Sequence, residues 1–243
     1  MELKNANKDI IDQLQKEILL LQGFKAEECH ASNSISLPSV ETAFPNSVFP
    51  IGAIHEFITA EPEHAAACSG FIAGLLKSLM VNSGACLWIS ASRTLFPPAL
   101  KSFGVEPDRI IFIDLKNEND VLWAMEEALK CEGLAAVIGE VSGINLTQSR
   151  RLQLTVEKSR VTGLILRNNT QKLATTACVA RWQIKPIISE LEDGMPGVGF
   201  PRWNVELLKV KNGIPGAWDI EWSDGRFNLL QYEEVIFEKL NVG

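Results

Sequence analysis

The stretch that decides the fold is ACLWISASRTLFPPALKSFGVEPDRIIFID, residues 85–114. It contains two short apolar runs, at 85–91 and 109–114, of the kind that form buried strands. Between them, residues 97–103 are expected to form a short helix. A strand, a helix and a second strand in this order predict one unit of a parallel sheet, because parallel strands need a crossover connection.

The same alternation continues on both sides of this unit. Further strands are expected at 53–59, 134–141 and 162–167, and further helices at 65–80, 120–131 and 147–160. The strands are apolar almost throughout, which indicates a sheet covered on both faces. After residue 169 the alternation stops, and strands are expected at 178–184, 204–211 and 217–222, with hairpin-type turns at 212–213 and 224–225. The predicted class is therefore α/β: a mainly parallel sheet with helices on both faces and a C-terminal antiparallel extension.

The N-terminal region has a different texture. Ile11, Leu14, Ile18 and Leu21 recur at helical spacing and predict an amphipathic helix within residues 1–24. Residues 25–48 are rich in Ser, Asn and Pro and are expected to form a linker or an extended arm. A core at 49–228 and a tail at 229–243 complete the predicted organisation. The helix is a candidate partner-binding arm, and the alternative is that it folds back on its own sheet.

Composition limits the possible functions. The 243 residues are 46% hydrophobic and carry a formal charge of −7. They can bury a core, but so acidic a chain is expected to bind nucleic acid weakly or not at all, because cationic contacts to phosphate supply most non-specific affinity. Five dispersed cysteines without a CxxC pair argue against a metal site. With no apolar leader and no membrane-length segment, the chain is expected in the cytoplasm.

The turn after the first strand of the core is where a phosphate-binding loop is expected. Residues 58–71 read ITAEPEHAAACSGF, and their position and length suit a P-loop. A P-loop needs glycines, a lysine and a Ser or Thr, whereas this turn contains Glu61 and three alanines. An alanine forced into a left-handed conformation would cost roughly 1–2 kcal/mol. The chain therefore lacks the chemistry of an intact ATPase.

Residues 49–68, FPIGAIHEFITAEPEHAAAC, resemble the segment that leads into the P-loop of the RecA recombinase family, and the similarity extends to about residue 227. The resemblance places the P-loop lysine on Ala67 and its threonine on Cys68. It places the catalytic glutamate on Ser92 and the Walker B aspartate on Gly139, with Glu140 as a shifted carboxylate. The two DNA-binding loops are reduced to residues 142–146 and 169–173. The implied degenerate nucleotide site comprises Glu61, Ala66, Ala67, Cys68, Ser92, Gly139 and Glu140, and implies no cofactor and no enzymatic activity.

This pattern resembles the ImuA family, RecA-like relatives grouped with the cell-division inhibitor SulA. The stretches SGFIAGLLKSLM, LWISASRTLFPPAL, SRRLQLTVEKSRVTG and PGVGFPRWNVELLKVKNG carry the resemblance. It implies a non-catalytic adaptor in the SOS-type DNA damage response and mutagenic translesion synthesis. The implied partners are the Y-family polymerase-like protein ImuB, an error-prone replicative-type DNA polymerase and RecA itself.

Two other functions compete with the adaptor hypothesis. One is a residual nucleotide-dependent enzyme that uses Glu140 and His64. The other is a SulA-like inhibitor of cell division.

Two surface features have a functional and a structural interpretation. The first is a basic cluster formed by Arg150, Arg151, Lys158 and Arg160. It could contact DNA, but it is more typical of a helix face that is solvated or paired with acidic neighbours. The second is the set of six tryptophans. Trp203, Trp218 and Trp222 are expected to fill the core, whereas an exposed tryptophan would mark a partner surface.

Overall fold

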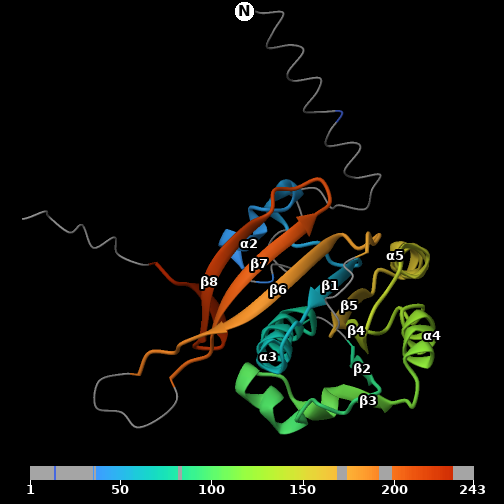
Figure 1. The fold of residues 1–243 in the computed structure, drawn as a ribbon, viewed down its shortest axis with the longest axis horizontal. Coiled ribbons are helices and arrows are strands. Elements are labelled where there is room, and N and C mark those ends of the chain that lie inside the picture. The colour runs from blue at the N-terminus through green and yellow to red at the C-terminus, as the bar shows by residue number, and fades with distance from the viewer. Residues whose placement is uncertain are drawn as a thin grey trace, which may run out of the picture.

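A computed structural model of the chain describes residue 14, residue 35 and residues 37–81, 84–168, 174–191 and 199–231. One sheet runs through these residues in the order β3-β2-β4-β5-β1-β6-β7-β8-β9 (Figure 1). The parallel strands are β1 (Ile54–Ile58), β2 (Cys86–Ser90), β3 (Ile110–Asp114), β4 (Ala136–Val141), β5 (Thr162–Arg167) and β6 (Ala180–Ile187). The antiparallel strands that follow are β7 (Arg202–Val210), β8 (Gly216–Ser223) and β9 (Arg226–Leu229). This arrangement confirms the predicted α/β class, which is that of a RecA-like core.

Helices cover both faces of the parallel part, as predicted. α3 (Pro62–Leu79) and the 3-10 helix η3 (Pro97–Phe103) lie on one face, and α4 (Glu118–Ala128) and α5 (Leu146–Ser159) lie on the other. Side chains of a strand point alternately to the two faces. On β4, Ile138 belongs to the cluster under α3, whereas Val137 packs with Val121 and Met125 of α4. The strands are apolar throughout because both of their faces are buried.

Two strand assignments differ from the sequence-based expectation. β6 was expected in the antiparallel extension, but it pairs in parallel with β1 and antiparallel with β7, so it joins the two halves of the sheet. β9 was not expected as a strand, and it pairs with β8 after the Asp224–Gly225 turn. Its four residues are too few for a recognisable alternation of apolar and polar side chains.

The segment expected as a linker or an extended arm is in part a component of the core. Residues 25–34 lie outside the described residues, but the rest contains a short helix, α2 (Pro38–Glu41), and a 3-10 turn, η2 (Pro45–Ser47). Leu37, Val40 and Phe44 are buried in the same cluster as α3. This part of the expected linker or extended arm therefore packs on the core, which the sequence did not indicate because its apolar residues have no regular spacing.

The tryptophans divide into a buried group and one exposed residue. Trp203 and Trp222 are buried and Trp218 packs against the core, as expected for core filling. Trp123 on α4 is 64% exposed. The described helices include none with both the length and the apolar composition needed to cross a membrane.

Candidate functional site

The turn between β1 and α3 is too short to surround a phosphate. β1 ends at Ile58 and α3 begins at Pro62, so only three residues, Thr59 to Glu61, connect them. The amide of Ala65 already donates to the carbonyl oxygen of Glu61 at 3.1 Å. The expectation that this turn has the length of a P-loop was therefore wrong, because the helix starts three residues earlier than its apolar pattern indicated.

The predicted site residues of this segment consequently lie inside a regular helix. Ala66 is exposed, and Ala67 and Cys68 are buried in the first half of α3. Their backbone is helical, so no alanine adopts the left-handed conformation that a P-loop would impose. The amides that a P-loop would turn toward phosphate belong here to a continuous helix.

The start of α3 is also unfavourable for an anion. Helix N-termini attract phosphate through free N–H groups and the helix dipole. Here Pro62 occupies the first helical position and has no N–H. Glu61 and Glu63 flank it, and both are exposed. Their negative charges would repel a polyphosphate at this end of the helix.

Two other predicted residues meet at the ends of β2 and β4. The carboxylate of Glu140 accepts hydrogen bonds from Ser92 Oγ at 2.7 Å, Ser90 Oγ at 2.8 Å and Trp88 Nε1 at 2.6 Å. Ser90 Oγ also accepts the amides of Ser92 and Arg93, which holds the turn after β2. Three donors thus engage the carboxylate that could have held a metal ion. The sequence analysis missed Trp88 and Ser90, although an indole N–H in a buried strand requires an acceptor.

Gly139 lies on the other face of the sheet from Glu140. A Cβ atom at Gly139 would be 2.8 Å from Met125 Sδ of α4. A carboxylate at this position would be buried against α4, far from the α3 face. The carboxylate on the α3 side at the end of β4 is therefore Glu140.

Cys68 lies close enough to this cluster for the negative charge of Glu140 to affect its thiol. Burial raises the pKa of its thiol far above the usual value, and the negative charge of Glu140 raises it further. The thiol therefore stays protonated at neutral pH and is a poor nucleophile.

The hypothesis of a residual nucleotide-dependent enzyme uses His64 and Glu140, but the described residues show no hydrogen bond between these two side chains. Nδ1 of His64 is enclosed and has no hydrogen-bond partner among the described residues. The donors to Glu140 are the indole and the two serine hydroxyls. Within the described ranges, no three His, Cys, Asp or Glu side chains are grouped so that they could hold a metal ion.

Known proteins with similar sequences give the family. The chain is 32% identical over 200 residues to Protein ImuA of two strains of Caulobacter vibrioides, covering 77% of this chain and 82% of the relative. The chain belongs to the ImuA family. No protein-family model matches it.

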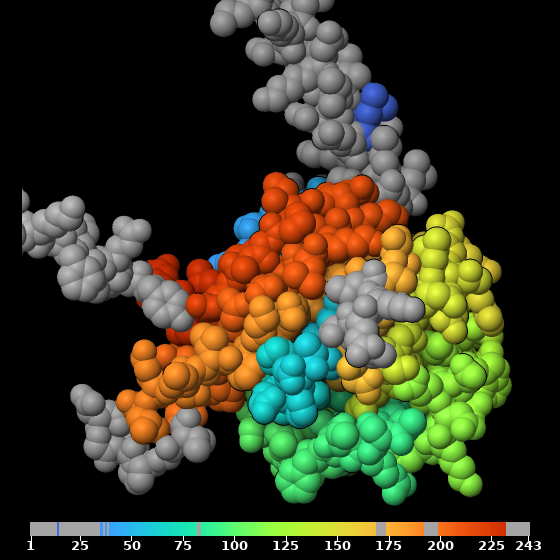
Figure 2. Space-filling view, in the orientation of Figure 1, coloured from blue at the N-terminus to red at the C-terminus, as the bar shows by residue number. Residues whose placement is uncertain are grey.

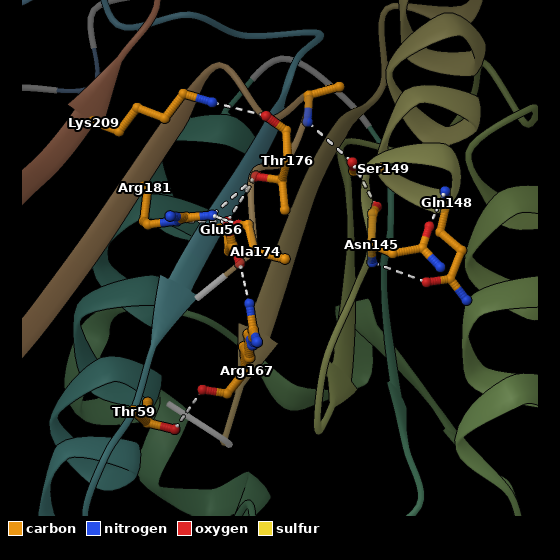
Figure 3. Close-up of polar contacts among 11 residues, drawn as sticks. Glu56, Thr59, Asn145, Gln148, Ser149, Arg167, Ala174, Thr176, Arg181 and Lys209 are labelled. Atoms are coloured by element: carbon orange, nitrogen blue, oxygen red, sulfur yellow. Dashed lines mark hydrogen bonds and ion pairs between the residues drawn. The ribbon is translucent and has the colours of Figure 1, made fainter. Parts of the chain in front are cut away.

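A second polar cluster in this ImuA-family chain is centred on Glu56 of β1, beneath the connections that follow β4 and β5 (Figure 3). Glu56 is fully buried and accepts hydrogen bonds from Arg167 Nη1 at 3.2 Å, Arg181 Nε at 2.9 Å and Thr176 Oγ1 at 2.9 Å. Lys209 Nζ donates to the carbonyl oxygen of Thr176 at 2.7 Å. The three cationic side chains Arg167, Arg181 and Lys209 therefore already bind groups of the protein.

The connections after β4 and after β5 were both expected to be short, and only the first of them is. Only four residues, 142–145, join β4 to α5, and Asn145 forms a capping box with Gln148 at the start of that helix. β5 and β6 are separated by twelve residues, 168–179, so this connection is longer than the loop expected at 169–173. Residues 169–173 are outside the described ranges. Beyond them, Ser149 Oγ accepts the amide of Ala177 at 3.0 Å and fixes the connection to α5 (Figure 3).

The remaining predicted residues belong to the N-terminal helix and to the basic cluster of α5. Leu14 is helical and 51% exposed, whereas Ile11, Ile18 and Leu21 lie outside the described residues. In the basic cluster of α5, Arg151 pairs with Glu126 of α4 at 2.6 Å. This contact agrees with the structural interpretation of that cluster.

Proposed function

We propose that this ImuA-family chain is a non-catalytic adaptor in DNA-damage-induced mutagenesis that acts through protein–protein contacts. Membership in the ImuA family supports the involvement in mutagenesis. The observation that carries the non-catalytic role is the three-residue turn from Thr59 to Glu61 between β1 and α3. A loop of this length cannot direct several amides at one phosphate group.

The partners are those that the family resemblance implies: the polymerase-like protein ImuB, an error-prone replicative-type polymerase and RecA. Weak or absent DNA binding fits this role. It is supported by the net charge of −7 and by the engagement of Arg167 and Arg181 with Glu56. A cation that already pairs with a buried carboxylate has little free energy to gain from a phosphate group.

Nucleotide binding provides the first test. Calorimetric titration of the full chain with ATP and Mg²⁺ is expected to give no saturable heat, with a RecA recombinase as the positive control. The double variant Glu61→Gln, Glu63→Gln removes both carboxylates near Pro62 but keeps the turn length, and it is also expected not to bind. Micromolar affinity of either protein would contradict the proposal, and binding by the double variant alone would show that charge rather than loop length abolishes the site.

Partner binding provides the second test. The full chain is expected to co-purify with the ImuB protein of the same organism, and removal of residues 1–24 is expected to reduce the yield. Glu106→Ala changes one exposed carboxylate of the core and serves as the control that retains binding. Failure to retain ImuB or RecA under conditions where the chain is folded would refute the adaptor role.

A further inference from the structure

α4 and α5 form a two-helix layer of opposite charges on one face of the sheet. In Figure 1 they lie next to one another, and in Figure 2 they form the green and yellow side of the molecule, away from β8. α4 carries four acidic residues and no basic one: Glu118, Asp120, Glu126 and Glu127. α5 carries three basic residues and one acidic one: Arg150, Arg151, Lys158 and Glu157. One ion pair, between Arg151 and Glu126, already joins the helices.

Each helix also exposes a large apolar side chain near the middle of its outer face, and Leu146 at the start of α5 is exposed as well. Trp123 is 64% exposed and Leu154 is 45% exposed. Each lies two positions after a fully or nearly fully buried residue, Val121 and Leu152 respectively. Successive residues on a helix are about 100° apart, so a displacement of two positions turns a side chain away from the sheet. Exposed tryptophan surrounded by charges is typical of the centre of a protein–protein interface.

We propose that the α4–α5 layer is the interface of a homodimer. A two-fold axis that lies in the interface, parallel to the helices and midway between them, places α4 of one copy on α5 of the second copy. In two equivalent contacts, the acidic α4 of each copy then faces the basic α5 of the other copy. Trp123 of each copy approaches Leu154 of the other. Such an interface uses the same patch on both subunits and must be self-complementary, a condition that this layer satisfies in charge and in apolar centre. The proposal does not depend on the function proposed above.

The size of the layer sets the strength of the association. At about 1.5 Å per residue the helices are about 17 and 21 Å long, and each is about 10 Å wide. The layer therefore offers about 400 Å² per copy, against about 800 Å² per partner in a standard interface. The dimer is accordingly weak and reversible. It is also sensitive to salt, because its charged rim is exposed to solvent.

Sedimentation equilibrium of the full chain over a range of concentrations tests the proposal. The average mass is expected to rise from that of one copy toward that of two at low salt, and to rise less at high salt. Trp123→Ala is expected to weaken the dimer about tenfold or more, as for a central interface residue. Its exposed side chain can be removed without loss of folding. Lys211→Glu changes an exposed charge in the β7–β8 turn and serves as the control that leaves the mass unchanged.

Charge reversal gives the decisive experiment. Asp120→Lys with Glu127→Lys cancels the net negative charge of α4, so that it no longer attracts the basic α5, and Arg150→Glu with Lys158→Glu makes both helices acidic. Each double variant alone is expected to stay monomeric, and an equimolar mixture of the two is expected to form a heterodimer. Circular dichroism verifies that both variants are folded.

Three outcomes would overturn the proposal. The first is a wild-type mass of one copy at every concentration. The second is a dimer that neither reversal weakens. The third is a mixture of the folded variants that remains monomeric.

Discussion

The carboxylate of Glu140 accepts the indole N–H of Trp88 at 2.6 Å, across the pair of strands formed by β2 and β4. Two serine hydroxyls bind the same carboxylate. A carboxylate at the end of a central strand could hold a metal ion, but here it organises the turn after β2. The carboxylate therefore stabilises this turn, and its removal should have a measurable cost.

Glu140→Ala should lower the free energy of unfolding by about 1–3 kcal/mol, because the buried indole N–H loses its acceptor. Glu140→Gln keeps one oxygen acceptor and should cost less. Urea denaturation measures both changes. Glu106→Ala removes an exposed carboxylate that lies 3.6 Å from Lys101, and it should change stability by less than about 0.5 kcal/mol. Equal stability of the Glu140→Ala and Glu106→Ala variants would disprove the structural role.

Glu56→Gln should be more severe. It leaves two guanidinium groups, of Arg167 and Arg181, facing a neutral amide in a buried site. Loss of one partner from a buried ion pair typically costs about 3–5 kcal/mol, and the remaining hydrogen bonds place this variant near the lower limit. Chemical denaturation gives the value. Lys130→Ala breaks the exposed pair with Glu127 and is the comparison, expected within about 0.5 kcal/mol of the wild type.

Stability should decrease as the pH falls from 7 to 5 because of His55. Burial lowers the pKa of His55 to about 4, and its ring is held neutral between the carbonyl oxygen of Pro50 and the indole N–H of Trp182. In the unfolded chain the pKa is about 6.5, so over this interval the unfolded state binds more protons. About 2 kcal/mol should be lost between pH 7 and pH 5. Urea unfolding at several pH values measures this loss.

His55→Gln provides the control for the pH experiment. The variant is less stable overall, but its stability should vary much less over the same interval because the titrating group is gone. If both proteins lose the same free energy between pH 7 and pH 5, another group causes the dependence.

Gly74→Ala should destabilise the chain, although alanine is usually favoured over glycine in a helix by about 1 kcal/mol. A Cβ atom at Gly74 would lie 2.4 Å from Phe227 Cζ and 2.9 Å from Trp222 Cζ3. Such overpacking typically costs about 1–3 kcal/mol. Gly133→Ala is the matched control, because its Cβ atom would meet no atom within 4 Å. Thermal unfolding should show a lower Tm for the first variant only.

The sequence predicted the parallel sheet because its strands are apolar on both faces, a property that depends on composition alone. It did not predict that the helix expected at 65–80 begins as early as Pro62. Residues 62–66 contain charged and small side chains without apolar periodicity, so the first turn of α3 looked like a loop. Proline at the first helical position was the available signal.

The sequence identified residues of the candidate site, such as Ser92 and Glu140, but it did not predict which of them are in contact. Glu140 and Ser92 are separated by 48 positions, yet they are hydrogen bonded because β2 and β4 are neighbours in the sheet. Strand order depends on long-range pairing, which local patterns do not encode. The same applies to Leu37 and Phe44, which are buried although their segment has no regular apolar spacing.

The short Thr59–Glu61 connection also limits what substitutions in this segment could achieve. A lysine introduced at position 67 would place its ammonium group at a buried position of α3 and not beside a phosphate group. A loop long enough to surround a phosphate group would require additional residues between β1 and α3 as well as new side chains. A point substitution alone therefore cannot create a phosphate-binding loop at this turn, because the length of the loop depends on the number of residues between β1 and α3.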